Sequence, residues 1–171
     1  MSIESWLKEF MPIDAKEASK LSDTEMLDWC IKKFEGCLSK NLRKHDLRSS
    51  LDHHLESIGN TAGVYEFGTW NCPLCIKYLN TTDCTECPLY LAREDVRCDE
   101  KTDTEKRSPW EQFHTTSPLA MLKCLEKARR WVQKREQQKR SDCVAKLGEL
   151  AAEQAIQQPR LADDLVKFSF G

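Results

Sequence analysis

The residues of this sequence best suited to chemistry are five cysteines near its middle. Cys72 and Cys75 form one Cys-x2-Cys pair, Cys84 and Cys87 form a second, and Cys98 follows. Five of the nine cysteines thus fall within 27 residues. Thiolates at positions i and i+3 of a tight turn can bind one soft metal ion, and two such pairs complete a tetrahedron. The spacing therefore predicts a structural metal site, with zinc as the favoured ion.

Five cysteines for four coordination positions leave one spare. We predict that Cys72, Cys75, Cys84 and Cys87 are the zinc ligands and that Cys98 is the substitute. His114 is a weaker reserve. Six nearby apolar side chains could shield the ion from water, namely Trp70, Leu74, Tyr78, Leu79, Leu89 and Tyr90.

Three other uses of these cysteines remain open on the sequence alone. An iron–sulfur cluster is the main alternative, because Cys87-Pro88 resembles the Cys-Pro ending of bacterial cluster loops, although their close cysteine run is absent. Disulfides suit small secreted domains, and nothing in the sequence indicates secretion. A redox-active Cys-x-x-Cys is expected at a strand–helix junction, and no α/β alternation surrounds these pairs. We therefore predict zinc.

The composition predicts a protein of the cytoplasm. The chain has 171 residues, of which 40% are hydrophobic and 32% charged, and its formal net charge is −2. No basic segment followed by an apolar run opens the sequence, so we expect no signal peptide, and no stretch is long and apolar enough for a membrane-spanning helix. The remaining cysteines, Cys30, Cys37, Cys124 and Cys143, are interpreted as small buried or half-buried hydrophobic residues.

The front of the chain is predicted to be helical. Apolar spacing indicates a short helix over residues 2–10, stopped by Pro12, and a brief helix through residue 20. Ser22 and Glu25 form a capping-box signature, and an apolar stripe follows through residue 42. Gly36 interrupts this helix and suggests a close packing neighbour.

The pattern then predicts a third helix and, after it, a change of structure. Leu47, Leu51, Leu55 and Ile58 recur on one helical face, which Gly59-Asn60 would end. Residues 61–70 suggest a turn and a short extended segment. Residues 92–109 are mostly charged and predict an exposed loop that is tied down at Cys98.

The last part of the chain predicts one long helix or two. Ser117-Pro118 is a start signal, with serine as cap and proline at the first helical position. Residues 133–142 are polar all round, and Ser141-Asp142 could cap a new helix that ends at Pro159. The apolar residues of the tail could dock on the body or on a partner.

One basic run offers an alternative function. Basic residues crowd residues 123–140, and with Trp110 or Trp131 as stacking partners they could bind nucleic-acid phosphates. A solvated helix face, balanced by acidic patches, is the favoured interpretation, because nucleic-acid modules are usually more basic than a pI of 6.1. The candidate phosphate-binding residues are Lys127, Arg129, Arg130, Lys134 and Arg135.

No catalytic motif stands out. The chain has no Gly-rich phosphate loop, Gly-x-Ser-x-Gly or His-Glu-x-x-His motif. His53 and His54 adjoin in sequence, so they would point about 100° apart on a helix. Four thiolates around zinc make a closed site without an open catalytic position. We therefore expect a protein that is not an enzyme.

The sequence resembles small uncharacterised proteins of phages and prophages. The matching features are residues 31–45, which end in histidine, then Cys72-Pro-Leu-Cys75, Cys84-Thr-Glu-Cys87-Pro88-Leu89 and Cys98. No reaction is assigned to that family. The resemblance implies a virus-borne accessory protein that acts in the cytoplasm of the host cell, where it binds and inhibits a bacterial host complex, such as a defence complex.

These observations together predict a mainly α protein. A helical N-terminal segment (residues 1–60) and a C-terminal helical segment with a tail (residues 117–171) flank a zinc-held, loop-rich module with little β structure (residues 61–116). The predicted function is a non-enzymatic protein-binding module, plausible as an inhibitor of a host complex. A nucleic-acid-binding protein is the alternative, and a homodimer through residues 117–157 is compatible with either.

Overall fold

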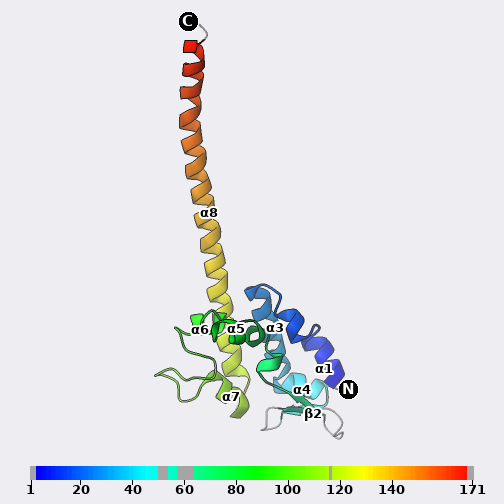
Figure 1. The fold of residues 1–171 in the computed structure, drawn as a ribbon. Helices are drawn as coiled ribbons and strands as arrows, with labels where there is room; N and C mark the ends of the chain where they lie inside the picture. The colour runs from blue at the N-terminus through cyan, green and yellow to red at the C-terminus, as the bar shows by residue number, and fades with distance from the viewer. Residues whose placement is uncertain (1–2, 50–53, 58–63, 116, 169–171) are drawn as a thin grey trace. The chain divides into compact units, whose positions relative to one another are not determined.

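The computed structural model describes residues 3–49, 54–57, 64–115 and 117–168, most of them in helices. The chain divides into two compact units, residues 1–132 and residues 133–171. Helix α8 (Leu119–Phe168) belongs to both units: residues 119–132 are part of the first unit, and the remaining residues are part of the second. Figure 1 shows the course of the chain through these elements. The predicted mainly helical class is confirmed.

Three helices open the first unit, and the second and third have side-chain caps. They are α1 (Ile3–Phe10), α2 (Ala15–Ala18) and α3 (Asp23–Gly36). Asp14 caps α2 by accepting a 2.8 Å hydrogen bond from the Glu17 amide. The predicted capping box of α3 is present, because Ser22 accepts from the Glu25 amide while the Glu25 carboxylate accepts from the Ser22 amide at 3.0 Å. The starts of α2 and α3 are therefore set by side chains that satisfy the free amide groups of the first helical turn.

Gly36 lies where α3 passes closest to α1. A Cβ atom there would lie 2.7 Å from Phe10 Cγ and 2.9 Å from the Trp6 ring. Trp6 Nε1 donates a 2.9 Å hydrogen bond to the Gly36 carbonyl. The predicted close neighbour is thus confirmed, but the single helix predicted through residue 42 is wrong. The chain breaks after Gly36 and resumes as α4 (Ser39–Lys44), because the carbonyl at the helix end is engaged by Trp6.

Residues 47–49 and 54–57 form strands, so the predicted third helix is wrong. Strands β1 (Leu47–Ser49), β2 (His54–Ser57) and β3 (Val64–Glu66) form an antiparallel sheet in that order. Leu47 and Leu55 are both buried, and Leu55 pairs with Ser49. Residues two apart on a strand share a face, and directly paired residues of neighbouring strands point to the same side, so the pairing of Ser49 with Leu55 places Leu55 on the same face as Leu47. Leu51 and Ile58 lie outside the described residues.

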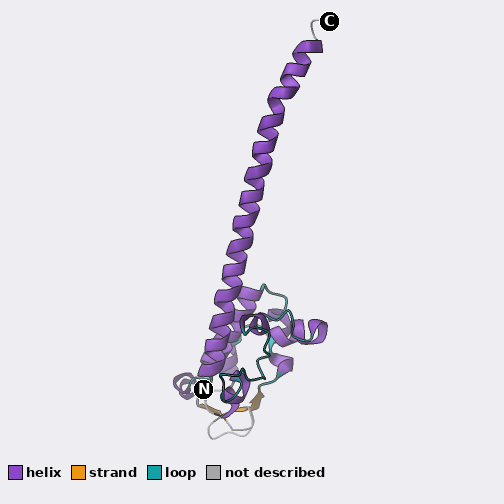
Figure 2. Ribbon diagram, turned by 90° about the vertical axis from the view of Figure 1, so that its left-hand side faces the viewer, coloured by secondary structure: helices purple, strands orange, loops and turns teal. Residues whose placement is uncertain are grey.

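The first unit has two neighbouring apolar clusters. The larger joins α3 to α5 (Pro73–Thr82), α6 (Pro88–Ala92) and the start of α8, with Leu27, Leu74 and Leu125 almost completely buried. The second joins α1 and α4 to the sheet. Phe113 of α7 (Pro109–Thr115) lies edge-on to Phe34 and Phe67 at 4.8 and 5.1 Å between ring centroids. Aromatic packing thus links the clusters. Figure 2 shows the strands gathered at one side of this mostly helical unit.

Helix α8 settles the choice between one helix and two. Ser117 caps it as predicted, since its Oγ accepts a 3.2 Å hydrogen bond from the Leu119 amide. The helix continues through Pro159 to Phe168, so the predicted stop at Pro159 is wrong. The side chains of the tail lie outside the described residues. Within the described ranges, no helix combines the length and the apolar character needed to cross a membrane.

Candidate metal centre

Six cysteines line one cavity of about 130 Å³ in the first unit. The structure brings together all five cysteines of the predicted cluster, including the substitute Cys98, and adds Cys30 from the middle of α3. The cavity walls also contain Leu74, Leu79, Leu89 and Tyr90, which were expected to shield an ion. Trp70 does not do so, because 64% of its surface is exposed. The six lining cysteines are Cys30, Cys72, Cys75, Cys84, Cys87 and Cys98.

The first cysteine pair is placed by the start of α5. Cys72 is the residue that precedes the helix, Pro73 occupies its first position, and Cys75 lies one turn later. The Ile76 amide donates a 2.9 Å hydrogen bond to the Cys72 carbonyl, which closes this first turn. Because proline at the first helical position has a fixed φ and needs no hydrogen-bond acceptor, the two sulfurs are held together at little entropic cost.

The second pair is placed by a left-handed turn and the start of α6. Asp83 and Cys84 have φ values of 47° and 68°, a conformation that reverses the chain after α5. The Cys87 amide then donates a 2.9 Å hydrogen bond to the Cys84 carbonyl, and Pro88 opens α6 directly after Cys87. Both pairs therefore use a Cys-Pro step at a helix start to direct a sulfur into the cavity.

Cys98 is positioned by a loop that wraps around one buried arginine. Arg93 is only 6% exposed, and its guanidinium donates to the carbonyls of Val96, Arg97 and Glu100 and to the Glu105 carboxylate. The Trp110 amide donates a 3.2 Å hydrogen bond to the Cys98 carbonyl. The loop predicted to be tied at Cys98 alone is thus also tied by Arg93, which sequence reasoning missed.

Cys72 is the electrostatic centre of the cluster. Hydrogen bonds from the thiols of Cys30 and Cys75 hold the pKa of Cys72 well below its usual range, and the same hydrogen bonds raise the pKa values of the two donors. Burial raises the pKa of Cys87 to about 12 and, together with the nearby charge of Cys72, raises that of Cys98 further. Cysteine sulfurs that bind a soft cation release their protons, so this group of thiols could serve as a set of metal donors.

A buried cation adjoins this cluster. Lys33 is 3% exposed, and its ammonium donates 2.8 Å hydrogen bonds to the backbone and side-chain oxygens of Asn71. The ammonium lies 5.0 Å from the ring centroid of Phe67 and 5.6 Å from that of Tyr65. Burial lowers the pKa of Lys33, while the neighbouring Cys72 opposes that shift. The positive charge therefore faces the residues that would carry the negative charge of a metal–thiolate centre.

Cys84 lies at the edge of the group. Its surroundings are less buried than those of the other cluster cysteines, and the guanidinium of Arg97 stands beside it. Arg97 lines the cavity and pairs with Asp99 at 3.1 Å. Cys30, in contrast, is 2% exposed and contacts Cys72 directly. The spacing of the cysteines in the sequence does not connect Cys30 to the cluster. The helical pattern of apolar residues predicts only that Cys30 is buried.

The chemistry of this donor set fits zinc. Sulfur ligands bound 2.3 Å from a common ion lie about 3.8 Å apart, a separation close to that of hydrogen-bonded thiols. Among the described residues, however, no three or more His, Cys, Asp or Glu side chains are already gathered as a formed metal site. The support for a metal is therefore the type of the side chains and the cavity that they line.

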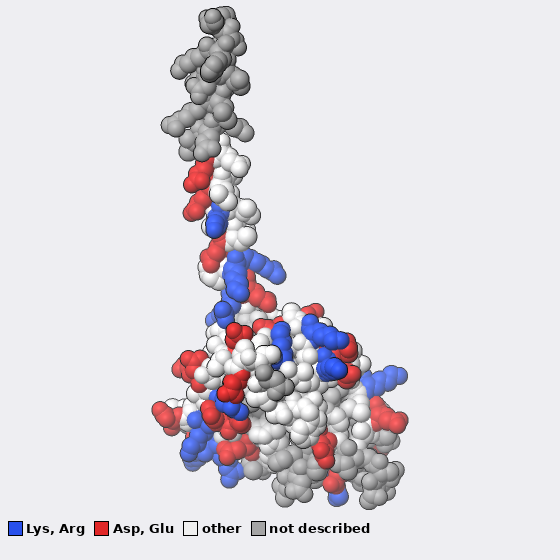
Figure 3. All heavy atoms as spheres, in the orientation of Figure 1, with Lys and Arg blue, Asp and Glu red and all other residues white. Residues whose placement is uncertain are grey.

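The basic residues of α8 are partly engaged in ion pairs. Arg129 Nε lies 2.6 Å from Asp28 Oδ1, and Arg130 lies 4.0 Å from Glu126. Lys134 and Arg135 are exposed and belong to the second unit. Figure 3 shows acidic and basic side chains interspersed over the visible face of the first unit. The predicted nucleic-acid interface stays a prediction, and two of its arginines already have a carboxylate neighbour.

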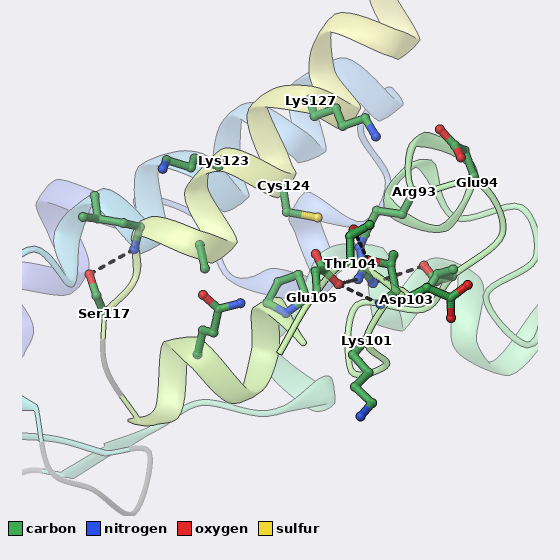
Figure 4. A pocket seen from close by; sticks show the side chains of 16 residues that line it. Arg93, Glu94, Lys101, Asp103, Thr104, Glu105, Ser117, Lys123, Cys124 and Lys127 are labelled. Atoms are coloured by element: carbon green, nitrogen blue, oxygen red, sulfur yellow. Dashed lines mark hydrogen bonds and ion pairs between the residues drawn. The ribbon is translucent and has the colours of Figure 1, made fainter. Parts of the chain in front are cut away.

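Lys127 lines a larger and more open cleft of about 900 Å³. Figure 4 shows this cleft between the start of α8 and the loop around Arg93, with Lys123, Lys127 and Cys124 on the helix and Glu105 on the loop. The Arg93–Glu105 pair, at 2.7 Å, occupies the loop side. Because acidic and basic groups alternate along its wall, the cleft has no single charge preference.

A Ser–His–carboxylate chain occurs elsewhere in the first unit. Ser5 Oγ lies 2.7 Å from His45 Nδ1, and His45 Nε2 lies 3.0 Å from Glu9 Oε2. His45 is 2% exposed, and its contacts with Ser5 and Glu9 join α1 to the end of α4, which gives this histidine a structural position. Sequence reasoning missed this network because its members are about 40 residues apart.

The comparisons with known proteins add no assignment: no protein-family model, no curated protein and no solved structure matches this chain.

Proposed function

We propose that this chain is a zinc-stabilised protein-binding module without enzymatic activity. The observation that carries the proposal is the convergence of six cysteines, from α3, the start of α5, the turn before α6 and the Arg93 loop, on one cavity. Zinc prefers thiolates in a closed, tetrahedral arrangement, and such sites stabilise a fold instead of performing chemistry. The metal would supply cross-links between these segments.

Zinc would fix the irregular part of the first unit. Residues 93–108 contain no helix or strand and are held by Cys98, Arg93 and short-range hydrogen bonds. Because a thiolate–zinc bond at Cys98 would restrict this loop before any partner arrives, binding would require less ordering. A rigid surface formed by loops is the usual product of a structural zinc site.

Trp70 is the candidate centre of the binding surface. It lies in a 3-10 turn (Thr69–Asn71) that leads directly into Cys72, and 64% of its surface is exposed. Its ring covers Gly68, where a Cβ atom would lie 2.5 Å from the ring. Large, rigid aromatic residues dominate the binding energy of many protein interfaces. The resemblance to phage proteins supports a bacterial host protein, in the cytoplasm, as the partner that is covered and inhibited.

A site-specific cross-linking experiment tests this function. A photo-reactive amino acid at position 70 should capture a discrete host protein from bacterial cells, and purified partner should then bind with an affinity that Trp70→Ala lowers by at least tenfold. Leu119→Ala is a matched control, since Leu119 is 52% exposed in the same unit. Chelation of zinc should weaken binding as well.

The dependence on salt separates this function from nucleic-acid binding. An interface centred on an aromatic residue should tolerate salt between 50 and 200 mM, whereas phosphate binding through several basic residues weakens by about 10³-fold or more over that range. Steep salt dependence together with loss of binding in the combined variant of Arg129, Arg130, Lys134 and Arg135 would contradict the proposal.

A further inference from the structure

We propose that Cys72 and Cys75 are a redox-reactive pair, which hydroperoxides convert reversibly into a disulfide. This inference goes beyond the proposed binding function, because the disulfide itself requires no metal. The two cysteines form a Cys-x-x-Cys sequence at the start of α5. Disulfides in reducing compartments are usually transient and either catalytic or redox-sensing, so a pair of this kind would respond to an oxidant.

The backbone gives this pair the local geometry of a redox-active Cys-x-x-Cys. Cys72 has an extended conformation, with φ −112° and ψ 113°, and α5 begins at the next residue. The junction between extended chain and helix that such a motif requires is therefore present here. The Ile76 amide donates a 2.9 Å hydrogen bond to the Cys72 carbonyl, so Cys72 already takes part in the first helical turn.

One helical turn brings the two cysteines within reach of a disulfide. Residues three apart on an α-helix have Cα atoms about 5 Å apart, and disulfides join Cα atoms that are about 4.4–6.8 Å apart. The side chains of Cys72 and Cys75 both line the same cavity. A bond between these two sulfurs would thus form without the movement of one element past another.

An oxidant has access to this pair. Cys72 and Cys75 are both half-buried, whereas Cys30 and Cys87 of the same cavity are buried, with 2% and 7% of their surface exposed. The cavity of about 130 Å³ has room for a small hydroperoxide, since one water molecule occupies about 30 Å³ in the liquid. A hydroperoxide would therefore reach this pair more readily than it reaches the buried thiols.

Cys72 is the member of the pair that attacks the oxidant. It occupies the residue before α5, where the free amide groups of the first helical turn favour a negatively charged sulfur. Lys33 lines the same cavity, and its ammonium donates 2.8 Å hydrogen bonds to both oxygens of Asn71, the residue that precedes Cys72. Cys75 lies one turn into the helix, away from these groups, and is the resolving cysteine.

The oxidation has two steps. The Cys72 thiolate attacks one oxygen of hydrogen peroxide, the O–O bond breaks and hydroxide leaves, which gives a sulfenic acid at Cys72. The sulfur of Cys75 then attacks the sulfur of Cys72, the S–O bond breaks, and the hydroxyl group leaves as water with the proton of the Cys75 thiol. Two thiols and one peroxide thus yield one disulfide and two water molecules. A small thiol returns the pair to the reduced form by thiol–disulfide exchange.

Oxidation and zinc binding would exclude each other, a consequence that rests on the proposed function. Cys72 and Cys75 are two of the four proposed zinc ligands, and a sulfur in a disulfide is no longer available as a thiolate ligand. The redox state of the pair would therefore decide whether zinc holds the loops of the first unit.

Peptide mapping after peroxide treatment tests the pair. The full-length chain, reduced and freed of metal with a chelator, is treated with one equivalent of hydrogen peroxide, alkylated and digested with trypsin. Residues 49–77 form one tryptic peptide, whose cysteines are Cys72 and Cys75, and residues 78–93 form another, whose cysteines are Cys84 and Cys87. We expect the first peptide to lose two hydrogens and escape alkylation about tenfold faster than the second, and to regain both thiols after reduction.

The two peptides have cysteines at the same spacing, so the comparison between them isolates the effect of the fold. In urea the preference for residues 49–77 should disappear. A preference that persists in urea, or equal rates for both peptides in the native chain, would overturn the inference. A disulfide between Cys72 and Cys30 in place of the one to Cys75 would overturn it as well.

Serine variants assign the roles of the two cysteines. Cys75→Ser should accumulate a sulfenic acid at Cys72, which a 1,3-diketone probe labels, whereas Cys72→Ser should leave Cys75 unlabelled. Cys143→Ser, at an exposed cysteine of α8, should form the disulfide at the rate of the wild type. Labelling of Cys75 in Cys72→Ser would contradict the assignment of Cys72 as the attacking residue.

Metal content measured on the same preparation separates this inference from the proposed function. A chain that binds no zinc but forms the Cys72–Cys75 disulfide would refute the zinc module and support the redox pair. A chain that binds zinc but does not form the disulfide after the metal is removed would do the opposite.

Discussion

Lys33 combines three properties that are unusual for lysine, a residue that is mostly exposed to solvent. It is buried, its ammonium is hydrogen-bonded to Asn71 and lies close to aromatic rings, and it lines the cysteine cavity. Asn71 directly precedes Cys72, so Lys33 both anchors the turn that presents the first thiolate and supplies positive charge to it. One residue thereby links the core of α3 to the proposed centre.

Lys33→Met should weaken both the fold and metal binding. The change leaves the Asn71 carbonyl without its buried donor, which costs about 1–3 kcal/mol of unfolding free energy, and removes a charge that balances the thiolates. We expect zinc affinity to fall about 10- to 100-fold in competition with a chelator, as for other residues that support metal ligands. Lys32→Met, on the exposed side of α3, should change neither quantity. Unchanged zinc affinity in Lys33→Met would argue against its role in charge balance.

Cys37 should make the protein sensitive to alkaline pH. Burial raises the pKa of this thiol from 9.0 to about 12, so between those values the unfolded chain loses the proton that the folded chain retains. Stability from this thiol is therefore complete below pH 9 and declines as the pH rises toward 12. In urea unfolding, the decrease from pH 8 to pH 10.5 should be about 2 kcal/mol smaller in Cys37→Val than in the wild type. Equal decreases would contradict the assignment, and Cys143→Val serves as the exposed control.

Helices and loops have opposite roles at the scale of elements. Helices α3, α5, α6 and the start of α8 provide the apolar walls of the cavity, while the turn before α6 and the Arg93 loop bring cysteines to it. The loop depends on Arg93, whose planar guanidinium reaches four acceptors that a single ammonium group could not satisfy together.

Arg93→Lys should loosen this loop without unfolding the helices. Lysine keeps the charge but loses about two of the hydrogen bonds, so we expect a loss of about 2 kcal/mol in unfolding free energy. Hydrogen exchange should accelerate in residues 96–105 and remain unchanged in α3. Arg130→Lys, at an exposed ion pair of 4.0 Å, is the matched control. Protection of residues 96–105 equal to that of the wild type would show that the loop is held in another way.

The boundary within α8 gives a prediction for the whole molecule. Met121, Leu122 and Leu125 belong to the core of the first unit, whereas the compact unit ends at Val132. A chain of residues 1–132 should therefore fold and bind zinc with the same stoichiometry as the full chain. A chain of residues 1–118 lacks those core residues and should not fold. Circular dichroism and zinc content distinguish the two, and an unfolded 1–132 chain would refute the division.

Features that depend on neighbouring residues can be predicted from this sequence, whereas features that depend on the packing of distant elements cannot. Caps such as Ser22 and Ser117 act within one helical turn, so their residues identify helix starts directly. The five clustered cysteines were also recognised by local spacing. Cys30 was not, because its approach to Cys72 depends on how α3 packs against α5. The strands at residues 47–49 and 54–57 resemble a helix in the sequence, because an apolar residue at every fourth position is compatible with both structures until the partner strand is known.

The wide separation of the cavity's cysteines sets an order of events during synthesis. Cys30 and Cys98 are 68 residues apart, which at about 5–20 residues per second corresponds to roughly 3–14 s of translation. During that interval the ribosome has delivered only part of the ligand set, and the apolar face of α3 still awaits Leu125 of α8. The nascent chain is thus committed to its final form late, when Cys98 and the last core helix emerge almost together. Stalled chains that end between these points should remain open to protease until both have emerged.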